Sequence, residues 1–330
     1  MKRVLVIGAT GAMGSSVVRE LCRNEQVQPE KIRCFTRNPN SDAARQLAAL
    51  DERIEWASGD SADEASIQAA MKNVDAVFCN TTFFPDGTVA AERRKGNIAL
   101  EAARQAGVEH FVYASLDPAT RLSAGQLSVP HYDGKAAVEA DIDAQRSDEF
   151  MLQQKDGWYS HHVSVLVTCP YMENFFDFFV PQDGELSDGR TGKVFRGPLG
   201  AEQFWQMIAL QDIGWFAAHL LSDRQTWGGR TLRIAGEEMA MPEIVRQFEA
   251  LTGIAAEYAP MSEEEFLNSG LPNAHDPLNN MLIYREGFFE RRDLAELRRI
   301  HPELLSFRKW LEKTEWRGEP RTMRKDAATG

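Results

Sequence analysis

The stretch "VLVIGATGAMGSSVVREL" (residues 4–21) decides the fold. A short apolar run leads into a loop with glycine at positions 8, 11 and 14, and an amphipathic segment follows directly. Glycine at these places permits a tight turn and lets the backbone approach a pyrophosphate at the N-terminus of a helix. Strand, glycine loop and helix in this order predict a dinucleotide-binding start to the chain. A turn without any ligand is the alternative.

The same alternation continues through the first half of the chain. Apolar runs at 4–8, 32–36, 54–58, 75–80 and 110–115 alternate with amphipathic stretches at 15–23, 42–50, 64–72 and 91–107. Apolar strands that alternate with helices predict a parallel sheet covered on both faces. We therefore expect an α/β fold, a Rossmann doubly wound parallel sheet with a smaller α/β C-terminal domain. Runs at 163–168 and 231–236 are further candidate strands.

A change in character near residue 170 sets the expected domain division. Residues 1–170 form the predicted nucleotide-binding Rossmann domain, to which a later strand near 230–236 returns. Residues 171–316 are aromatic-rich at first and later amphipathic, which indicates a smaller, interleaved domain for a substrate or partner. Residues 317–330 are polar, and we expect a disordered tail there.

Net charge and cysteine usage limit the function classes. A formal net charge of −12 argues against nucleic acid or an anionic membrane as a partner held by bulk electrostatics. The first apolar run is too short for a signal segment or a membrane span. Four scattered cysteines without a CxxC pair indicate reduced thiols in the cytoplasm or nucleus. Cys79 and Cys169 are interpreted as buried apolar side chains rather than redox switches.

No metal site is expected. His161 and His162 precede an apolar run, and no carboxylate or cysteine stands at ligand spacing from them.

The end of the second predicted strand distinguishes the two nicotinamide dinucleotides. An acid at this place accepts from the ribose hydroxyls of NAD(H), whereas an arginine accommodates the 2′-phosphate of NADP(H). Here "CFTRNPN" (34–40) supplies Arg37 and Asn38, with no acid before Asp42. A guanidinium pairs with phosphate through charge-assisted hydrogen bonds. The sequence therefore favours NADP(H), with a solvated surface arginine as the alternative.

Polar residues follow the third and fourth predicted strands. Asp60 and Ser61 come after the third strand, where an adenine would lie, and Asn80, Thr81 and Thr82 follow the fourth, beside the expected dinucleotide path. Ligands of such sheets bind at the carboxyl ends of the strands. Ordinary turn formation is the alternative for each of these residues.

Together these motifs resemble the NmrA-like family, atypical members of the short-chain dehydrogenase/reductase superfamily, and in particular its NADPH-sensing branch. The resemblance runs through nearly the whole chain: "GATGAMGSSVVREL", "TRNP", "GD", "HYDGKAAVE", "YMENF" and "GLPNAHDPLNNM". It implies a Rossmann domain, a small C-terminal domain and NADP(H) bound in the cleft between them. The chain departs from that branch in continuing "NSDAA" after "TRNP", and in carrying extra residues at 143–162.

The resemblance also implies roles for individual residues. The pyrophosphate would contact Gly8, Ala9, Thr10, Gly11, Ala12, Met13 and Gly14; the 2′-phosphate Arg37 and Asn38; the nicotinamide ribose Lys135; and the nicotinamide end Tyr171, Met172, Glu173 and Asn174. Arg94 replaces a family lysine near the cofactor.

The motif "HYDGK" (131–135) raises the question of catalysis. Reductases of this superfamily carry tyrosine four positions before the lysine, on one helix face, and the lysine charge lowers the pKa of the phenol. Here His131 takes that place before Lys135. A neutral histidine orients water or bonds a carbonyl oxygen; Tyr132 is either an inward substitute or a packed side chain. Ser115 takes roughly the place of the auxiliary serine, with a strand-end hydroxyl that bonds the backbone as the alternative.

Two functions follow from this pattern. The first is a redox sensor or regulator that binds NADP(H) and acts through protein partners without the catalytic tyrosine. The second is an NADPH-dependent reductase of a small carbonyl or quinone substrate, in which His131, Lys135 and Ser115 are the candidate catalytic residues. The identity of a partner or substrate, and whether the chain forms a homodimer, stay open.

Overall fold

The computed structural model describes residues 1–84, 86–271 and 273–323. The chain divides into two compact units. The first comprises residues 1–118, 130–168 and 213–233, and the second comprises residues 119–129, 169–212 and 234 onward. Residues 119–129, expected in the Rossmann domain, thus belong to the second unit.

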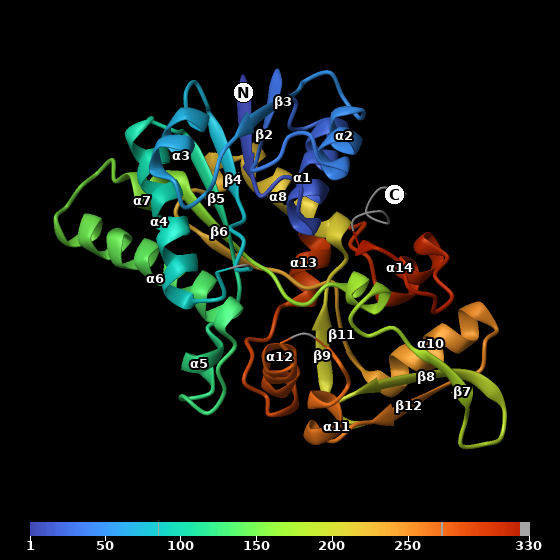
Figure 1. The fold of residues 1–330 in the computed structure, drawn as a ribbon. Coiled ribbons are helices and arrows are strands. Elements are labelled where there is room, and N and C mark those ends of the chain that lie inside the picture. The colour runs from blue at the N-terminus through green and yellow to red at the C-terminus, as the bar shows by residue number, and fades with distance from the viewer. Residues whose placement is uncertain (85, 272, 324–330) are drawn as a thin grey trace. The chain divides into compact units, whose positions relative to one another are not determined.

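The first unit is built on a seven-stranded parallel sheet (Figure 1). Its strands are β1 (Arg3–Ile7), β2 (Lys31–Thr36), β3 (Ile54–Ser58), β4 (Ala76–Cys79), β5 (His110–Ser115), β6 (Val163–Val167) and β10 (Thr231–Arg233). Their order is β10-β6-β5-β4-β1-β2-β3, so the winding reverses between β1 and β4. The predicted Rossmann doubly wound fold is confirmed. Ligands of such folds bind at the carboxyl ends of the strands on either side of this reversal.

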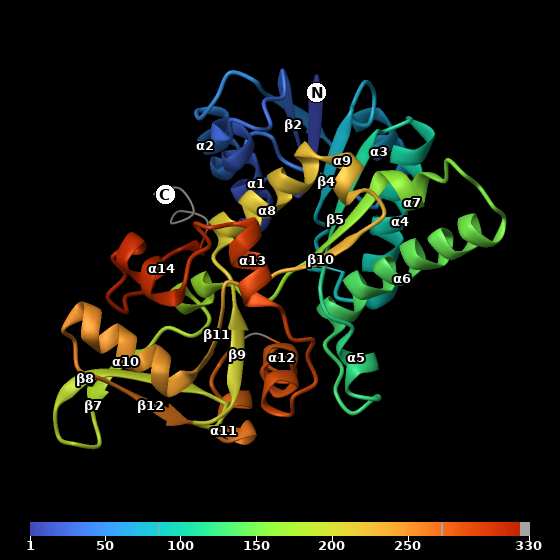
Figure 2. The same cartoon turned by 180° about the vertical axis from the view of Figure 1, so that it is seen from behind.

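Helices cover both faces of this sheet (Figures 1 and 2). They are α1 (Ala12–Arg23), α2 (Asp42–Ala48), α3 (Glu64–Ala70), α4 (Val89–Gln105), α6 (Pro130–Met151), α7 (Trp158–His162), α8 (Leu210–Ser222) and α9 (Arg224–Trp227). A core of buried aliphatic and aromatic side chains, including Leu5, Val77, Phe111 and Val165, fills the space between the sheet and α3, α4 and α6.

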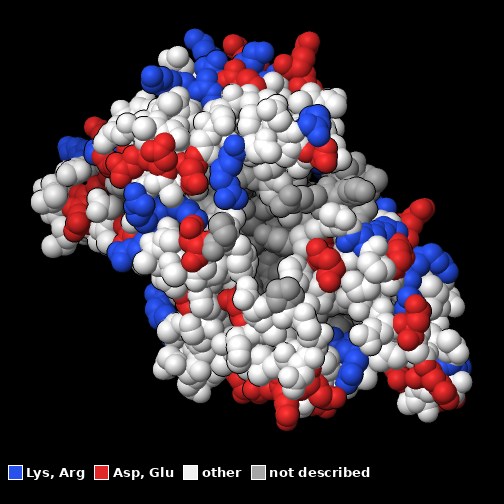
Figure 3. Space-filling model, in the orientation of Figure 1, with Lys and Arg blue, Asp and Glu red and all other residues white. Residues whose placement is uncertain are grey.

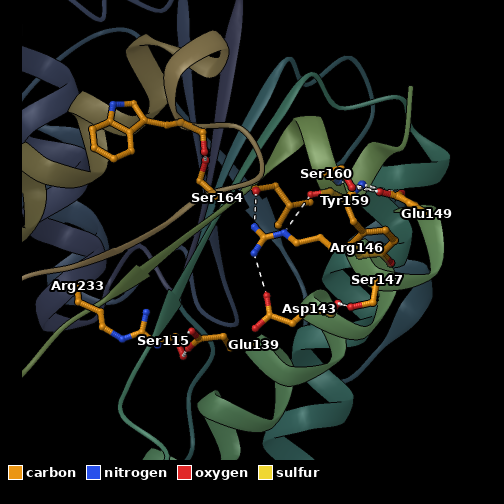
Figure 4. A network of polar contacts seen from close by, with 12 residues as sticks. Ser115, Glu139, Asp143, Arg146, Ser147, Glu149, Tyr159, Ser160, Ser164 and Arg233 are labelled. Carbon is orange, nitrogen blue, oxygen red and sulfur yellow. Dashed lines mark hydrogen bonds and ion pairs between the residues drawn. The ribbon is translucent and has the colours of Figure 1, made fainter. Parts of the chain in front are cut away.

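Residues 143–162, where extra residues relative to the family were expected, form the end of α6, the loop after it and the whole of α7 (Figure 4). Arg146 donates from Nη2 to the Val163 carbonyl at 2.8 Å. The Glu149 carboxylate accepts from the backbone N–H groups of Tyr159 and Ser160 at 2.9 and 2.8 Å, in the first turn of α7. These contacts hold the end of α6 against β6 and α7.

The second unit combines small sheets with short helices. A three-stranded sheet has the order β12-β8-β7, formed by Ala256–Pro260, Thr191–Gly197 and Gln182–Glu185; β11 (Glu237–Ala240) pairs with β9 (Phe204–Met207). The helical segments are α5 (Ala119–Leu122), η1 (Met172–Phe176), α10 (Met241–Thr252), α11 (Glu263–Leu267), α12 (His275–Arg285), α13 (Leu294–Ile300) and α14 (Phe307–Thr314). Its core is aromatic: Phe175 packs against Phe195, Trp205, Phe307 and Trp316.

The C-terminal segment requires a correction. Disorder was expected from residue 317, yet Arg321 donates from its backbone to the Phe176 carbonyl at 2.9 Å and from Nη1 to the Thr314 carbonyl at 2.7 Å. Its guanidinium also lies over the Phe176 ring. Residues 324–330 lie outside the described residues. In the parts of the chain that are described, no helix has both the length and the apolar character that a membrane crossing requires.

Candidate functional site

The loop after β1 requires glycine for its own geometry. Gly8 has φ +81°, and a Cβ there would lie 2.4 Å from the Asn80 carbonyl oxygen. A Cβ on Gly14 would lie 2.1 Å from the Gly8 carbonyl oxygen. The loop therefore packs directly on the end of β4 and on the first turn of α1, and any side chain at these two positions would force them apart.

The N-terminus of α1 is suited to an anion. Gly11 is the N-cap and supplies no side-chain acceptor, and the first turn, from Ala12 through Met13 and Gly14, contains no acidic residue. The first N–H groups of a helix have no intrahelical acceptor and carry a partial positive charge. A pyrophosphate supplies the acceptors and the negative charge that this loop lacks. The loop thus fits the phosphates of a dinucleotide.

Arg37 and Asn38 lie beside this loop. Thr36, the last residue of β2, places its hydroxyl 3.3 Å from that of Thr10, and the Asn38 N–H donates to the same Thr36 oxygen at 3.3 Å. Both Arg37 and Asn38 are exposed. A hydrogen bond from Lys95 lowers the pKa of Asp86, and the nearby charge of Arg37 contributes to the same shift. The β2 end therefore offers an exposed guanidinium next to the phosphate-binding turn.

Asp60 and Ser61 lie at the carboxyl end of β3, where Asp60 builds a turn. Its carboxylate accepts from the Ala62 N–H at 2.9 Å, and its carbonyl accepts from the Asp63 N–H at 3.0 Å. Asp63 then caps α3. The turn chemistry that the sequence left as an alternative is present for Asp60.

Lys135 is the centre of a buried polar cluster at the carboxyl end of β4. Its ammonium donates to Asn80 Oδ1 at 2.9 Å, to the Thr81 carbonyl at 2.8 Å and to Glu92 Oε1 at 2.9 Å. The Thr81 hydroxyl also donates to Glu92 Oε1, at 2.6 Å. An ammonium has three donors, and these three acceptors account for all of them. The structure thus brings together the predicted residues Asn80, Thr81 and Lys135.

Glu92 was not among the site residues predicted from the sequence. It lies on α4, is fully buried, and its carboxylate faces Lys135. Helices α4 and α6 pack closely here, because a Cβ on Gly134 of α6 would lie 2.8 Å from the Glu92 Cβ. The i, i+3, i+4 spacing of Glu92, Lys95 and Gly96 was the signal that would have placed Glu92 on the inner face of α4.

A second lysine, Lys95, holds the next part of the same loop. Its ammonium donates to the Thr82 carbonyl at 2.7 Å and forms an ion pair with Asp86. Arg94, which the family resemblance places near the cofactor, is exposed on α4. It is Lys95, one residue later, that faces the loop after β4.

Ser115 closes β5 with its hydroxyl turned to a carboxylate (Figure 4). The hydroxyl is fully buried and donates to Glu139 Oε2 at 2.7 Å. Arg233 Nη2 lies 3.1 Å from Glu139 Oε1. Burial raises the pKa of Glu139, while the Ser115 hydrogen bond and the Arg233 charge oppose that rise. Ser115 therefore belongs to a network in which the buried Glu139 links it to the partly exposed Arg233.

His131 lies among aromatic side chains at the start of α6. Its ring centroid is 4.7 Å from that of Tyr132, 6.2 Å from that of Phe83 and 6.4 Å from that of Phe84. Tyr132 is only 3% exposed and packs edge-on against the imidazole. Tyr132 is thus a packed side chain of the first unit.

Residues 171–174 lie in the second unit, and two of them are buried within it. Met172 is buried, and Glu173 accepts from the Leu210 N–H and from Trp310 Nε1, each at 3.1 Å. Burial raises the pKa of Glu173 to about 7. Tyr171 and Asn174 are partly exposed. Glu173 therefore joins the start of α8 to α14.

Cysteines and metal ligands contribute little to the site. Cys79 and Cys169 are buried, and burial raises the pKa of Cys79 to about 12. Across residues 1–84, 86–271 and 273–323, no three His, Cys, Asp or Glu side chains gather in a way that would hold a metal ion.

The sequence matches one protein family along most of its length. The sequence profile of the NmrA-like family matches residues 1–314. The chain is 30% identical over 285 residues to the NmrA-like family domain-containing oxidoreductase hkm9 of Aspergillus hancockii, covering 83% of this chain and 79% of that protein.

Two solved structures share the fold. NmrA, a negative transcriptional regulator, in complex with NADP has a TM-score of 0.70 at 16% identity, covering 94% of each chain. Triphenylmethane reductase of Citrobacter sp. complexed with NADP(H) has a TM-score of 0.70 at 17% identity, covering 94% of this chain and 99% of that one. At these identities the likeness establishes the fold, while the sequence match establishes the family. The chain belongs to the NmrA-like family.

Proposed function

We propose that this chain is an NADP(H)-binding protein that works as a redox-responsive regulator through protein partners. The observation that carries the proposal is the commitment of Lys135 and Ser115 to the buried carboxylates of Glu92 and Glu139. Position 131 carries histidine in place of the catalytic tyrosine, so the phenol is absent. The lysine and the serine that would assist that phenol are bonded to Glu92 and Glu139, respectively. The polar machinery of a tyrosine-dependent reductase is thus replaced by internal contacts.

Three features support NADP(H) as the ligand. The loop from Gly8 to Gly14 presents helix N–H groups to a pyrophosphate, and Arg37 with Asn38 stands exposed beside it for the 2′-phosphate. NmrA and the Citrobacter reductase were solved with NADP and NADP(H), respectively. When bound, the cofactor supplies or accepts a hydride. Asn80, Thr81 and Thr82 would line its path. Arg94, Tyr171 and Asn174 are assigned to it by family likeness, whereas Lys135, Met172 and Glu173 are buried, and Lys135 and Glu173 are held by internal contacts.

The pairing of Lys135 with Glu92 is the reason why we propose cofactor binding rather than catalysis as the function. In tyrosine-dependent reductases the lysine charge favours the phenolate and so assists proton transfer. Here the carboxylate of Glu92 balances that charge inside the protein, at 2.9 Å. Ser115 directs its proton to Glu139 rather than to a substrate oxygen.

A second candidate function is an NADPH-dependent reductase of a small carbonyl or quinone. It is favoured by the likeness to hkm9, which is named an oxidoreductase. Hydride transfer depends mainly on the positioning of cofactor and substrate, so such an enzyme would take its proton from His131 or from water.

Hydrogen exchange, measured with saturating NADPH and with saturating NADP⁺, tests whether the protein acts as a redox-responsive regulator. We expect the two redox states to protect different segments, because a sensor must distinguish them. Identical protection in both states would contradict the regulator. Steady NADPH oxidation with a carbonyl or quinone substrate, lost in His131→Ala, would establish the reductase instead.

A further inference from the structure

The second unit contains a cavity that the proposed function does not use. It has a volume of about 590 Å³, within the range of roughly 300–1,000 Å³ typical of small-molecule sites. Val194 and Arg196 on β8, with Gln182 on β7, line one side of it. Side chains alternate along a strand, and Phe195, between the two β8 residues, is buried in the aromatic core on the opposite face. The sheet thus covers one face with core and leaves the other to the cavity.

The opposite wall is apolar. Phe179, Met261 and Leu271 line the cavity and pack around the buried Phe266, so they are fixed by a small core of their own. Phe178 also lines the cavity, although it is 50% exposed. An apolar wall next to a half-exposed phenylalanine offers a surface for the hydrocarbon or aromatic body of a ligand.

The guanidinium of Arg196 contributes a buried donor that has no acceptor. Its Nη2 donates to Glu265 Oε1 at 3.2 Å. Its Nε is covered from water, and no polar atom of the described residues is placed to accept from it. A buried N–H without an acceptor costs free energy, which an acceptor on a ligand would recover. The Arg196 side chain as a whole is 36% exposed, so the guanidinium has room to turn Nε toward a ligand in the cavity.

The charge of this guanidinium is already balanced. Glu265 is fixed beside it, because the second oxygen of that carboxylate accepts from the Ser262 N–H at 2.8 Å in the capping box of α11. A ligand therefore needs to supply an acceptor oxygen but no charge. Among the described residues that line the cavity, Arg196 is the only Lys or Arg, so an anion would have to displace Glu265. Acidic side chains also gather over α11 at the lower edge of Figure 3, which further disfavours an anion.

We propose that this cavity binds a neutral carboxamide carried by an aromatic or branched aliphatic body. A carboxamide offers an acceptor oxygen and two N–H donors without a net charge. The oxygen would accept from Arg196 Nε, the N–H groups would donate to the side-chain oxygens of Gln182 and Asn268, and the body would lie against Phe178 and Phe179. An ammonium compound has no acceptor to offer to Nε.

Calorimetry with three compounds on the same phenylpropyl skeleton tests the site: hydrocinnamamide, hydrocinnamate and phenylpropylamine. Each is measured with the full chain and without nucleotide, so the result does not depend on the proposed function. We expect hydrocinnamamide to bind about tenfold or more tightly than the other two, because it alone supplies an acceptor to the charged donor without displacing Glu265. Equal affinities, or tightest binding of the anion or of the amine, would overturn the proposal.

Arg196→Lys tests the role of Nε. Lysine keeps a positive charge beside Glu265 but places a methylene where arginine has Nε, so the preference for hydrocinnamamide should disappear. The matched control is Arg190→Lys, because Arg190 is exposed outside the cavity, where it pairs with Asp188 and Glu249. This control should keep the preference. An unchanged preference in Arg196→Lys would overturn the proposal.

Two further variants test the charge balance and the apolar wall. Glu265→Gln removes the counter-charge of Arg196 but keeps a side chain that suits the capping box, so hydrocinnamate should bind more tightly than it does to the unaltered protein. Phe178→Ala should weaken the binding of hydrocinnamamide, because the phenyl body loses part of its surface. No gain for hydrocinnamate in the first variant, or no loss for hydrocinnamamide in the second, would contradict the proposed site.

Discussion

The ammonium of Lys135 lies 2.9 Å from the Glu92 carboxylate, and neither side chain has appreciable contact with solvent: their exposed fractions are 10% and 0%. The pair joins α4 to α6 and, through Asn80 and Thr81, fixes the loop after β4. Each charge is tolerated in this environment because the other is present.

The first prediction concerns the stability of this pair. Glu92→Leu should lower the free energy of unfolding by about 3–5 kcal/mol, because it leaves the Lys135 ammonium buried without its counter-charge. Urea denaturation measures the change. The double variant Glu92→Leu/Lys135→Met should recover part of the loss. The pair of Arg93 and Asp141, with side chains 55% and 24% exposed, is the control, and Arg93→Ala should cost less than about 1 kcal/mol. A loss in Glu92→Leu no larger than in this control would refute the buried-pair interpretation.

The second prediction concerns the glycine loop. Gly8→Ala and Gly14→Ala should both weaken NADP(H) binding strongly and lower the melting temperature, since their Cβ atoms would meet backbone at 2.4 and 2.1 Å. Gly11→Ala is the matched control in the same loop, because its Cβ would lie 3.3 Å from the nearest atom. Calorimetry and thermal unfolding should rank Gly11→Ala as the mildest of the three. An equal effect of all three substitutions would show that close contact of the added Cβ is not the reason why these positions require glycine.

A third prediction tests the 2′-phosphate contact. Arg37→Ala should weaken NADP(H) binding about tenfold or more, because a charge-assisted hydrogen bond is worth about 1.5–3 kcal/mol. The affinity for NAD(H), which has no 2′-phosphate, should stay the same. Arg45→Ala, which removes an exposed arginine of α2, is the control. If calorimetry finds the same preference for NADP(H) in Arg37→Ala as in the unaltered protein, this contact is absent.

The fourth prediction concerns pH. Burial raises the pKa of Glu173 from 4.5 to about 7, so the folded chain holds this proton more tightly than the unfolded chain does. The stability contributed by the protonated form is therefore complete below pH 4.5 and is lost as the pH rises to about 7. At about 1.4 kcal/mol per pH unit, the loss amounts to roughly 3 kcal/mol.

Glu173→Gln should remove this slope, and urea denaturation at several pH values measures it. The absolute stability will also fall, because the amide nitrogen cannot accept a hydrogen bond and either the Leu210 N–H or Trp310 Nε1 loses its acceptor, but that cost does not vary with pH. Glu303→Gln, which changes an exposed acid, should keep the slope. An unchanged slope in Glu173→Gln would assign the pH dependence to other groups.

Local sequence pattern was sufficient for the sheet and for the glycine loop. Alternating apolar and amphipathic runs are local properties, and the turn that Gly8 and Gly14 serve lies within seven residues. The partners of Lys135 and Ser115 could not be read in this way. Glu92 stands 43 residues from Lys135, and Glu139 stands 24 residues from Ser115, so only the packing of α4 and α6 on the sheet reveals them.

Some predictions required knowledge of which way a helix faces. Arg94 was expected near the cofactor from its position in the family pattern, but α4 turns its neighbour Lys95 toward the loop after β4. Glu173 was expected to line the nicotinamide end, yet its carboxylate bonds Trp310, which is 137 residues away. Helix rotation and long-range packing depend on the complete fold, which a single motif does not contain.

The most direct test of the central claim is the rate of NADPH oxidation by the unaltered protein and by His131→Tyr across a panel of carbonyl and quinone substrates. We expect no turnover above the protein-free rate in either protein, because restoring the phenol leaves Lys135 paired with Glu92 and Ser115 bonded to Glu139. Robust turnover by the unaltered protein, or its appearance in His131→Tyr alone, would contradict the account.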